Sequence, residues 1–362
     1  MKKLIITLFC AAMALFPAAA QDAPLRLAVA GITHGHIAEV TRRLDRGDFE
    51  IVGVYEADER YRNATSLSEH LPAEVFYDDL CRMLDETKPE AVICYGSIKD
   101  HFAAVEACAP RGIHVMVEKP LATKASDAYK MKKLAEKYGI MVLTNYETSW
   151  YASNHLAYDM VQEGKIGEIY RIQVYDGHRG PVEIKCHPMF LEWLTDPEGN
   201  GGGAVNDFGC YGANLATWLL GGEKPVSVSA VLKQHKPDIY PKVDDDATIL
   251  VEYPSVTVQI MASWCWPYNR KDMYIYGREG YIYQENHNKM EVMLEGENAP
   301  QDIVAPKLKY PYNDSFYYLK AAVRGEIEVL PTDLAALENN ITVVEILNAA
   351  VKSAKTGKKV KF

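Results

Sequence analysis

The sequence contains no run of basic residues. It carries 39 lysines and arginines against 49 aspartates and glutamates, which gives a formal net charge of −10 at pH 7. An acidic chain without a basic segment lacks the electrostatic footprint needed to bind nucleic acid or an anionic membrane surface. Both classes of partner are therefore excluded at the outset.

Metal-ligating side chains are also sparsely patterned. The seven cysteines form neither a CxxC pair nor the spacing of a zinc site. Cys10 lies within the first twenty residues, and Cys94 lies in an apolar run, where cysteine behaves as a small buried hydrophobic residue. His34 and His36 suggest a metal but lack a third ligand nearby, so they are interpreted as residues at the start of a helix. We expect free thiols and no metal.

The first twenty residues, MKKLIITLFCAAMALFPAAA, form a segment of their own. Two lysines precede an apolar run that ends in Pro17 and three alanines, which is the pattern of a secretory signal peptide. The run is too short, and its end too rich in small residues, to favour a transmembrane anchor. It has no twin arginine and no cysteine after the expected cleavage point, so we expect neither the folded-protein export route nor a lipid anchor. The sequence predicts an exported, periplasmic protein.

Short apolar segments alternate with segments of helical periodicity between residues 25 and 146. The apolar segments, predicted to be strands, cover residues 25–31, 50–58, 90–96, 114–120 and 140–146. The helices between them are expected over residues 36–45, 77–86, 100–112 and 122–139. Strands this apolar, separated by helices, indicate a parallel sheet covered on both faces. The predicted fold class is α/β, with a Rossmann-like, doubly wound domain over residues 25–147.

Polar and apolar residues alternate in the second half of the chain. After a helix at 154–167, strands are predicted over residues 168–177, 226–234, 246–253, 256–264, 273–277, 280–284 and 290–294, and helices around 313–325 and 333–355. This alternation with short turns is typical of an antiparallel sheet that is polar on one face. We predict an α+β domain over residues 148–362, with an open, mainly antiparallel sheet and last helices that could pack back on the first domain.

Residues 30–40, AGITHGHIAEV, stand where a dinucleotide-binding loop is expected. In the pattern Gly-x-Gly-x-x-Gly, Gly31 takes the first place, Thr33 the second and His36 the third, while Gly35 is out of register. The second glycine normally lets the backbone approach a pyrophosphate, and a side chain there could push the phosphate away. The loop alone leaves dinucleotide binding open.

Glu56 favours a dinucleotide, and NAD in particular. It follows Gly31 by 25 residues and lies at the end of the second predicted strand, where an acid can accept hydrogen bonds from a ribose 2′-hydroxyl. An acid at this place would repel the 2′-phosphate of NADP. Asp58 competes for the same role, and the nearby Arg60 and Arg62 keep NADP as an alternative.

Residues 199–222, GNGGGAVNDFGCYGANLATWLLGG, introduce a helix through a glycine-rich loop. Steps of four and three residues place Asp207, Tyr211 and Asn214 on one face of that helix. A carboxylate one turn before a phenol suits proton transfer. The alternative is a glycine loop that caps a core helix with Tyr211 as an ordinary buried tyrosine, and the spacing alone favours this alternative.

Two motifs together resemble a known family. VEKPLA (117–122) and GGGAVNDFGCYGANLATWLLG (201–221) resemble the glucose–fructose oxidoreductase, inositol dehydrogenase and rhizopine catabolism family, abbreviated Gfo/Idh/MocA. Residues 96–122, 163–169 and 353–360 also look like segments of that family, so the resemblance covers nearly the whole chain after the first twenty residues. It implies one domain that binds NAD(P) and a second whose open sheet covers the nicotinamide.

The common helix motif of that family is Asp-x-Gly-x-His-x-x-Asp. Asp207 and Gly209 match it, Tyr211 stands in place of the histidine, and Asn214 in place of the second acid. This variant is similar to that of the glucose–fructose oxidoreductase and dihydrodiol dehydrogenase branches. The resemblance implies that Lys119 reaches the reacting hydroxyl, that Tyr211 is the acid–base group and that Asp207 positions the lysine or the sugar.

Ligands of such sheets bind at the carboxyl ends of the parallel strands, where Gly31, Glu56, Gly96, Ser97, Lys119 and Asn145 lie; the other expected contacts come from the glycine loop, the resemblance and the aromatic side chains. Cofactor contacts are expected from Gly31, Thr33, His34, Gly35, His36, Glu56, Gly96, Ser97, His101, Glu118, Lys119 and Asn145. Substrate contacts are expected from Lys119, Asn145, Asp207, Tyr211, His187 and Trp193, with Trp150 and Trp266 as further aromatic candidates for a sugar face.

The resemblance implies an NAD(P)-dependent oxidoreductase that moves a hydride between a sugar or polyol hydroxyl and a tightly bound cofactor, in a protein expected to form homo-oligomers. Export to a compartment poor in free cofactor favours a redox-neutral reaction, so glycoside cleavage through a transient keto sugar is one alternative. A non-catalytic sugar-binding protein on a dehydrogenase fold is another, and Thr33 in the glycine loop is its best support.

Overall fold

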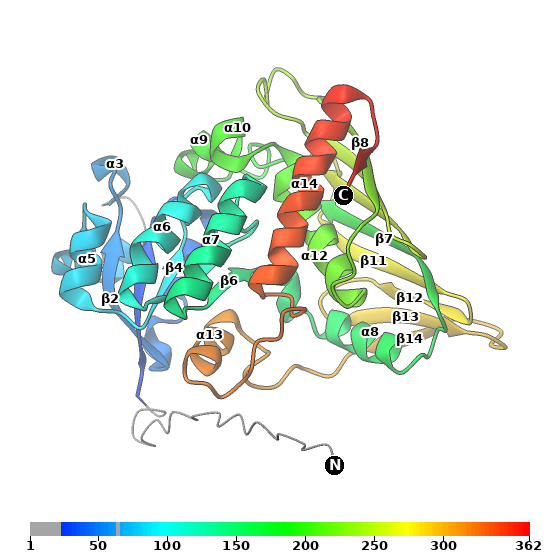
Figure 1. The fold of residues 1–362 in the computed structure, drawn as a ribbon, viewed down its shortest axis with the longest axis horizontal. Helices are drawn as coiled ribbons and strands as arrows, with labels where there is room; N and C mark the ends of the chain where they lie inside the picture. Colours follow the sequence, from blue (N-terminus) through cyan, green and yellow to red (C-terminus); the bar gives the residue numbers. More distant parts are fainter. Residues whose placement is uncertain (1–22, 63–65) are drawn as a thin grey trace, which may run out of the picture.

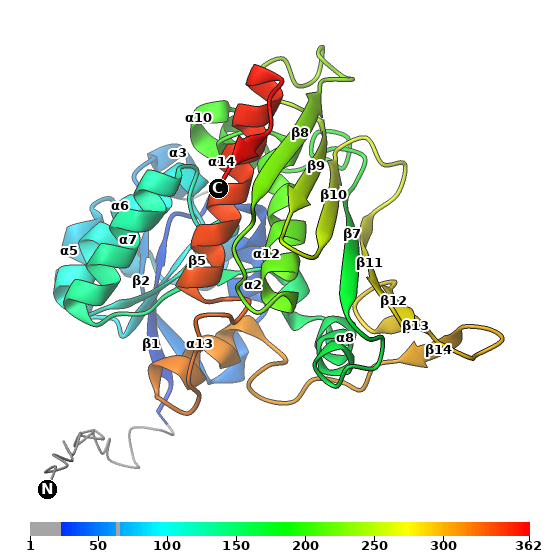
Figure 2. The same cartoon turned by 45° about the vertical axis from the view of Figure 1, so that its right-hand side comes forward.

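The computed structural model describes residues 23–62 and 66–362, so the predicted signal peptide lies outside the described residues. Two sheets stand beside each other with helices between them (Figures 1 and 2). Over the described ranges, no helix combines the length and apolar character needed to cross a lipid bilayer.

The first sheet is parallel throughout and has the order β3-β2-β1-β4-β5-β6. Its strands are β1 (Leu25–Ala30), β2 (Phe49–Tyr55), β3 (Phe76–Tyr77), β4 (Ala91–Cys94), β5 (His114–Glu118) and β6 (Val142–Asn145). All four residues of β4 are buried, as expected of a central strand with helices on both faces. The order reverses between β1 and β4, which is where a doubly wound sheet opens a crevice for a ligand. The predicted Rossmann-like fold class is confirmed.

The helices of the first half are shorter than predicted. They are α2 (Ala38–Thr41), α3 (Glu59–Arg62), α4 (Ser66–His70), α5 (Leu80–Thr87), α6 (His101–Cys108) and α7 (Ala125–Tyr138), with 3₁₀ turns η1 (Gly35–Ile37), η2 (Leu44–Arg46), η3 (Ala73–Val75), η4 (Ile98–Asp100) and η5 (Ala109–Arg111). The helix predicted over 36–45 is wrong as one element, because the chain there divides into η1, α2 and η2. Only Ile37 and Val40 are buried in this stretch, which gives a long helix no continuous apolar stripe.

The second sheet has nine strands in the order β14-β13-β12-β11-β7-β10-β9-β8-β15. Its strands are β7 (Ile169–Gly177), β8 (Ser227–Lys233), β9 (Asp246–Glu252), β10 (Thr257–Ser263), β11 (Arg270–Gly277), β12 (Gly280–Gln284), β13 (Lys289–Leu294), β14 (Gln301–Val304) and β15 (Val360–Lys361). Only the β7–β10 pair is parallel, so the predicted mainly antiparallel sheet is confirmed. β11 begins three residues before the predicted strand, and this places Lys271 inside the sheet.

The helices of the second half are η6 (Glu147–Trp150), α8 (Ala152–Gln162), α9 (Pro188–Leu194), α10 (Pro197–Asn200), α11 (Ala204–Asp207), α12 (Gly209–Leu219), α13 (Ser315–Val323) and α14 (Leu337–Thr356). In both views α12 and α14 lie between the two sheets (Figures 1 and 2). α14 contacts α7 and β6 on one side and α12 and β8 on the other. α13 packs on the first domain, where Phe316 and Leu319 share a buried cluster with Leu27 and Ile93.

Candidate functional site

Two neighbouring cavities lie at the carboxyl end of the parallel sheet. The smaller, of about 490 Å³, is called the strand-end cavity and opens above β1, β2 and β4. It is lined by six of the predicted cofactor residues: Gly31, Thr33, Glu56, Gly96, Ser97 and His101. The larger, of about 780 Å³, is called the interdomain cavity and is lined by residues of both domains. Size, position and lining of the strand-end cavity suit the nucleotide part of a dinucleotide.

Gly31 is fixed by its surroundings. Its φ of +76° lies in the left-handed region, and a Cβ atom there would stand 2.6 Å from the Cα of Gly96. The ends of β1 and β4 therefore meet without side chains between them. Gly35 differs, since a Cβ on it would meet nothing within 4 Å.

Glu56 follows β2 and lines the strand-end cavity beside the loop that contains Gly31. Its carboxylate accepts hydrogen bonds from the backbone N–H of Ile32 at 3.2 Å and of Asp58 at 3.0 Å. Burial raises the pKa of Glu56, and these two N–H groups partly offset the effect. Asp58, the competing acid, instead binds Arg60, and the Arg62 guanidinium binds the backbone carbonyls of residues 56 and 57. Of these two acids only Glu56 lines the cavity, which Asp100, Glu192 and Asp196 also line. A lining this rich in carboxylates fits a free ribose 2′-hydroxyl better than a phosphate.

Thr33 and Trp193 join the loop to the second domain. The indole Nε1 of Trp193 donates a hydrogen bond of 3.1 Å to Thr33 Oγ1, and the Tyr61 hydroxyl donates one of 2.5 Å to Glu192. α9 thus lies across the strand-end cavity and is tied to it at two points. Trp193 was predicted to contact substrate, but it lines the strand-end cavity rather than the interdomain cavity.

Glu118 is the hub of a buried polar cluster. Its Oε2 lies 3.1 Å from His36 Nδ1 and 4.0 Å from His34 Nε2, and its Oε1 accepts a 3.0 Å hydrogen bond from Asn145 Nδ2. Burial opposes ionisation, but His36 and Lys119 lower the pKa of Glu118 to about 2. The ionised carboxylate therefore anchors the loop to the end of β5.

The same cluster brings His34, His36 and Glu118 within 4.8 Å of one another, so the chain does hold a third ligand-type group. His34 Nδ1, however, accepts a hydrogen bond from the backbone N–H of His36 at 3.0 Å. Burial lowers the pKa of His34, so the ring is neutral and its one proton sits on Nε2, facing the carboxylate. A nitrogen that carries a proton is a donor and not a metal ligand, so in this arrangement His34 offers no free nitrogen to a metal. The hydrogen bonds that hold the cluster are those of Glu118 with His36 and Asn145.

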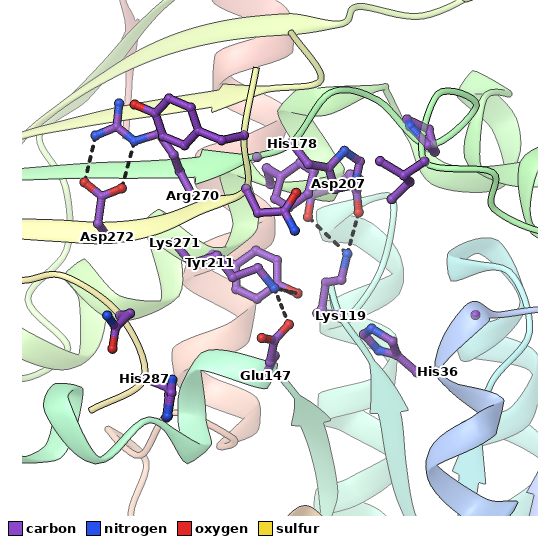
Figure 3. A pocket seen from close by; sticks show the side chains of 18 of the residues that line it. His36, Lys119, Glu147, His178, Asp207, Tyr211, Arg270, Lys271, Asp272 and His287 are labelled. Atoms are coloured by element: carbon purple, nitrogen blue, oxygen red, sulfur yellow. Dashed lines mark hydrogen bonds and ion pairs between the residues drawn. The ribbon is translucent and has the colours of Figure 1, made fainter. Parts of the chain in front are cut away.

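Lys119 projects into the interdomain cavity from the end of β5 (Figure 3). Its Nζ donates to Asp207 Oδ1 at 2.5 Å and to the Asp207 carbonyl at 3.1 Å. Trp264 Nε1 donates to the other carboxylate oxygen at 2.8 Å. Burial opposes both charges, yet the pair holds: Lys119 lowers the pKa of Asp207 to about 2, and Asp207 raises the pKa of Lys119. The cavity therefore contains a charged ammonium held in one place.

Tyr211 lies in the first turn of α12 and lines the same cavity (Figure 3). The Nζ of Lys119 lies 5.3 Å from the centre of its ring, and the Nζ of Lys271 lies 3.4 Å from its hydroxyl. Burial, reinforced by Glu147 and other nearby acids, raises the pKa of Tyr211 well above its usual value. An ammonium and a neutral phenol thus face one space that can hold a small molecule.

Several predicted residues lie elsewhere. His187 is exposed and caps α9 by accepting a hydrogen bond from Met189 N at 3.3 Å, so it is not placed to contact a ligand in either cavity. Trp150 Nε1 donates to Asn145 Oδ1, and Trp266 packs under Arg270, so both belong to the protein framework. Asn214 donates to the Leu334 carbonyl and joins α12 to the segment before α14.

Glu118 and Asn145, predicted to contact the cofactor, line neither of the two cavities. They hold residues that line them, as the hydrogen bond between the two and the contact of Glu118 with His36 show. The remaining predicted residues His34, Gly35 and His36 line the interdomain cavity beside Lys119.

Three residues near the Tyr211 hydroxyl or its partner Lys271 were not predicted: Lys271 itself, Glu147 and Asp176. Lys271 forms an ion pair with Glu147, and it lies opposite Asp176 in the β7–β11 pair. The alternating pattern of each strand does not show that Lys271 and Asp176 lie on the same face of the sheet. That follows only from the register between β7 and β11, which the sequence does not reveal.

Comparison with known proteins agrees with both domains. Residues 25–146 match a family model described as "Oxidoreductase family, NAD-binding Rossmann fold", and residues 155–283 match the "GFO/IDH/MocA C-terminal domain".

Among curated relatives, trans-1,2-dihydrobenzene-1,2-diol dehydrogenase of Macaca fuscata fuscata is 23% identical over 62% of this chain and 63% of its own length. D-glucoside 3-dehydrogenase of Escherichia coli K12 is 28% identical over 58% of each chain. The alignments thus span less than two thirds of these relatives.

The fold also matches a solved structure of an inositol dehydrogenase homologue from Azotobacter vinelandii complexed with NAD⁺. The TM-score is 0.79 at 18% identity, and the match covers 94% of this chain and 97% of the other. At this identity the match speaks for the fold.

Proposed function

The chain belongs to the Gfo/Idh/MocA family of oxidoreductases, and from that premise we propose that it transfers a hydride between NAD and a hydroxyl-bearing carbon of a sugar or polyol. The observation that carries the proposal is the convergence of Lys119 and Tyr211 on one cavity next to the strand-end cavity. When bound, NAD would supply the hydride acceptor. Glu56 and the backbone around Gly31 would hold its nucleotide part.

The protein's own residues divide the remaining work. Lys119 would donate a hydrogen bond to the reacting oxygen and stabilise negative charge as it develops there. Asp207 fixes the ammonium, because two of its oxygen atoms accept hydrogen bonds from Nζ. Tyr211 would take the hydroxyl proton in oxidation and return it in reduction, which makes this chain a tyrosine-containing variant within the family.

The test replaces each group while cofactor binding is followed separately. Lys119→Ala and Tyr211→Phe should each lower kcat by about 10²–10⁴, with NADH affinity measured by fluorescence nearly unchanged. The matched control is Tyr146→Phe, because Tyr146 is a buried tyrosine whose ring contacts Tyr211 but whose hydroxyl has no hydrogen-bond partner in the described residues. Normal turnover in Lys119→Ala with cofactor bound would rule out the proposed role.

We also propose that the cofactor stays bound through a redox-neutral cycle, such as sugar–sugar oxidoreduction or glycoside cleavage through a keto sugar. Support comes from α9, which crosses the strand-end cavity through the Trp193–Thr33 and Tyr61–Glu192 hydrogen bonds. Export directed by residues 1–20, with a periplasmic location, would call for such retention.

Mass spectrometry of small molecules released from freshly purified, gel-filtered protein decides between the alternatives. NAD or NADH in the released fraction, together with turnover without added cofactor, supports the retained-cofactor cycle. Sugar binding by calorimetry with neither NAD nor NADH binding would instead favour a non-catalytic sugar-binding protein.

A further inference from the structure

Tyr211 has almost no surface in contact with bulk water, and a substrate in the interdomain cavity would cover what remains. The residue is 1% exposed and packs between Phe208, Tyr146 and the two lysines. A general base in this position still has to lose the proton that it gains from an alcohol, if net oxidation is to continue. The surroundings of the hydroxyl therefore decide how that proton moves.

The charged groups near Tyr211 come from five elements. They are Lys119 and Glu118 at the end of β5, Asp207 of α11, Glu147 of η6, Lys271 of β11 and Asp176 of β7, with the Cys210 thiol beside them on α12. Burial raises the pKa of both Asp176 and Cys210, so neither readily carries a negative charge. The two ammonium groups are the only cations in this set of described residues.

The two lysines contact Tyr211 differently. Lys119 lies over the face of the ring, and its Nζ is directed at Asp207, which accepts two of its hydrogen bonds. Lys271 Nζ lies nearer to both parts of the side chain: 4.5 Å from the ring centre, against 5.3 Å for Lys119, and 3.4 Å from the hydroxyl oxygen itself. An ammonium at the hydroxyl stabilises the phenolate far more directly than one over the ring, since the negative charge forms on the oxygen.

Lys271 also connects the Tyr211 hydroxyl to the protein surface. Its side chain is 20% exposed, and it forms an ion pair with Glu147, whose side chain is 48% exposed. The Tyr151 hydroxyl donates a 2.5 Å hydrogen bond to the other oxygen of Glu147 and keeps that carboxylate in place. Tyr211, Lys271 and Glu147 therefore form a chain of polar contacts whose members become steadily more exposed (Figure 3).

We propose that Lys271, held by Glu147, is the positioning residue that governs when Tyr211 gains and loses its proton. This inference rests on the proposed function and assigns Lys119 and Lys271 different tasks: Lys119 serves the substrate oxygen, and Lys271 acts through Tyr211. In oxidation, Nζ of Lys271 releases one proton to water on its exposed side, while the Glu147 carboxylate keeps it beside the hydroxyl. Nζ then takes the phenolic proton, and the Tyr211 oxygen takes the proton of the alcohol. One proton leaves for each hydride transferred to the cofactor, the reverse sequence takes one up when the cofactor is reoxidised, and all three side chains return to their starting states.

The test follows the protonation of the phenol at position 211 as a function of pH, in the absence of turnover. Site-specific incorporation of 3,5-difluorotyrosine at position 211 makes the phenol more acidic and gives a single ¹⁹F signal that can be titrated in the full-length chain. Lys271→Met should raise the midpoint of this titration by about one pH unit, because an adjacent opposite charge shifts a titration by that order. Lys271→Arg keeps the charge and should restore the midpoint. Glu147→Gln should lower it, because a nearby negative charge is removed.

Two controls define the result. Lys224→Met removes a lysine that is also paired with a glutamate, Glu345, but at the far end of α12, and should leave the midpoint unchanged. Lys119→Met should shift the midpoint less than Lys271→Met. An unchanged midpoint in Lys271→Met, or in Lys271→Gln should the first variant fail to fold, overturns the inference.

Because the ¹⁹F titration needs neither cofactor nor substrate, it separates this inference from the proposed function. A shifted midpoint in a protein that never reduces NAD with a panel of sugars and polyols would reject the function and keep the Lys271–Tyr211 linkage. If turnover is found, Lys271→Met should move the pH profile of kcat/KM to higher pH, and Lys271→Arg should not.

Discussion

The buried ion pair of Lys119 and Asp207 concentrates much of the site's electrostatics in two residues. Their side chains are 6% and 7% exposed, and the carboxylate gains a further donor from Trp264. A buried pair of this kind is stable only while both members remain charged, since removing one leaves the other uncompensated. The site therefore depends on pH and on each partner.

Acid should destabilise the fold through Asp207 and Glu118. Both have a folded pKa of about 2, below the ordinary values of 3.8 and 4.5, so their contribution is present above those ordinary values and is lost as pH falls through about 2. We expect the free energy of unfolding in urea to fall between about pH 4.5 and pH 2. Asp207→Asn should cost about 3–5 kcal/mol at pH 7 and flatten part of this decline. Asp302→Asn, at an exposed position on β14, should change neither quantity.

At the level of single residues, the sequence identified some of the site and could not identify the rest. Motif resemblance placed Lys119, Asp207 and Tyr211, which the structure brings to one cavity, although their catalytic roles stay predictions. Lys271 and Glu147 carry no local signal, because a lysine in an alternating strand and a glutamate after a buried strand are usually solvent-facing residues. Their meeting depends on the pairing of β7 with β11 and on the position of η6.

The strand-end cavity is formed where secondary-structure elements end. β1 and β4 converge at Gly31 and Gly96, and α9 reaches back from the second domain to Thr33. The periodic pattern correctly predicted the strands that form these ends. It missed the two-residue β3 and the short helices α9 and α10, since segments this short leave hardly any periodicity to detect.

Gly31→Ala should damage the strand-end cavity, whereas Gly35→Ala should be tolerated. A Cβ on Gly31 would stand 2.6 Å from the backbone of Gly96 at a φ of +76°, so either the strand ends separate or the loop changes shape. We expect a loss of about 1–3 kcal/mol in unfolding free energy and much weaker NADH binding. Equal stability of the two variants in thermal and urea unfolding would contradict this account.

The hydrogen bond between Trp193 and Thr33 should slow cofactor release. Trp193→Phe and Thr33→Val each remove one partner, and each should raise the NADH dissociation rate by about fivefold, the equivalent of a net hydrogen bond of about 1 kcal/mol. The double variant should be no faster than either single one, because only one interaction is lost. Stopped-flow fluorescence measures the three rates, and additive effects in the double variant would show that the two side chains act separately.

At the scale of the whole molecule, the two domains share their cores. Phe316 and Leu319 of α13 pack into a cluster with strands of the first sheet, and Leu337 and Ile341 of α14 join a second cluster there. Residues from the end of the chain thus complete a domain formed at its beginning. A sequence pattern shows which faces of these helices are apolar, but it cannot show which domain those faces cover.

Phe316→Ala should therefore destabilise the first domain although it lies far along the chain. We expect a loss of about 3–5 kcal/mol, as for other buried phenylalanines, with NADH binding and far-UV signal lost in the same urea transition. Phe362→Ala is the matched control, because Phe362 is 44% exposed. A first domain that keeps its stability in Phe316→Ala would show that it folds without help from α13.

The position of α14 restricts how far the two domains can move relative to each other. This helix is seated against α7 and β6 on one side and against α12 and β8 on the other, so it works as a brace between the two halves. A hinge motion that moved the two domains apart would break the contacts of α14 with one of them. Entry and release of a dinucleotide should instead require movement of α9, which lies across the strand-end cavity. The rate of any cofactor exchange would then depend on how readily α9 moves.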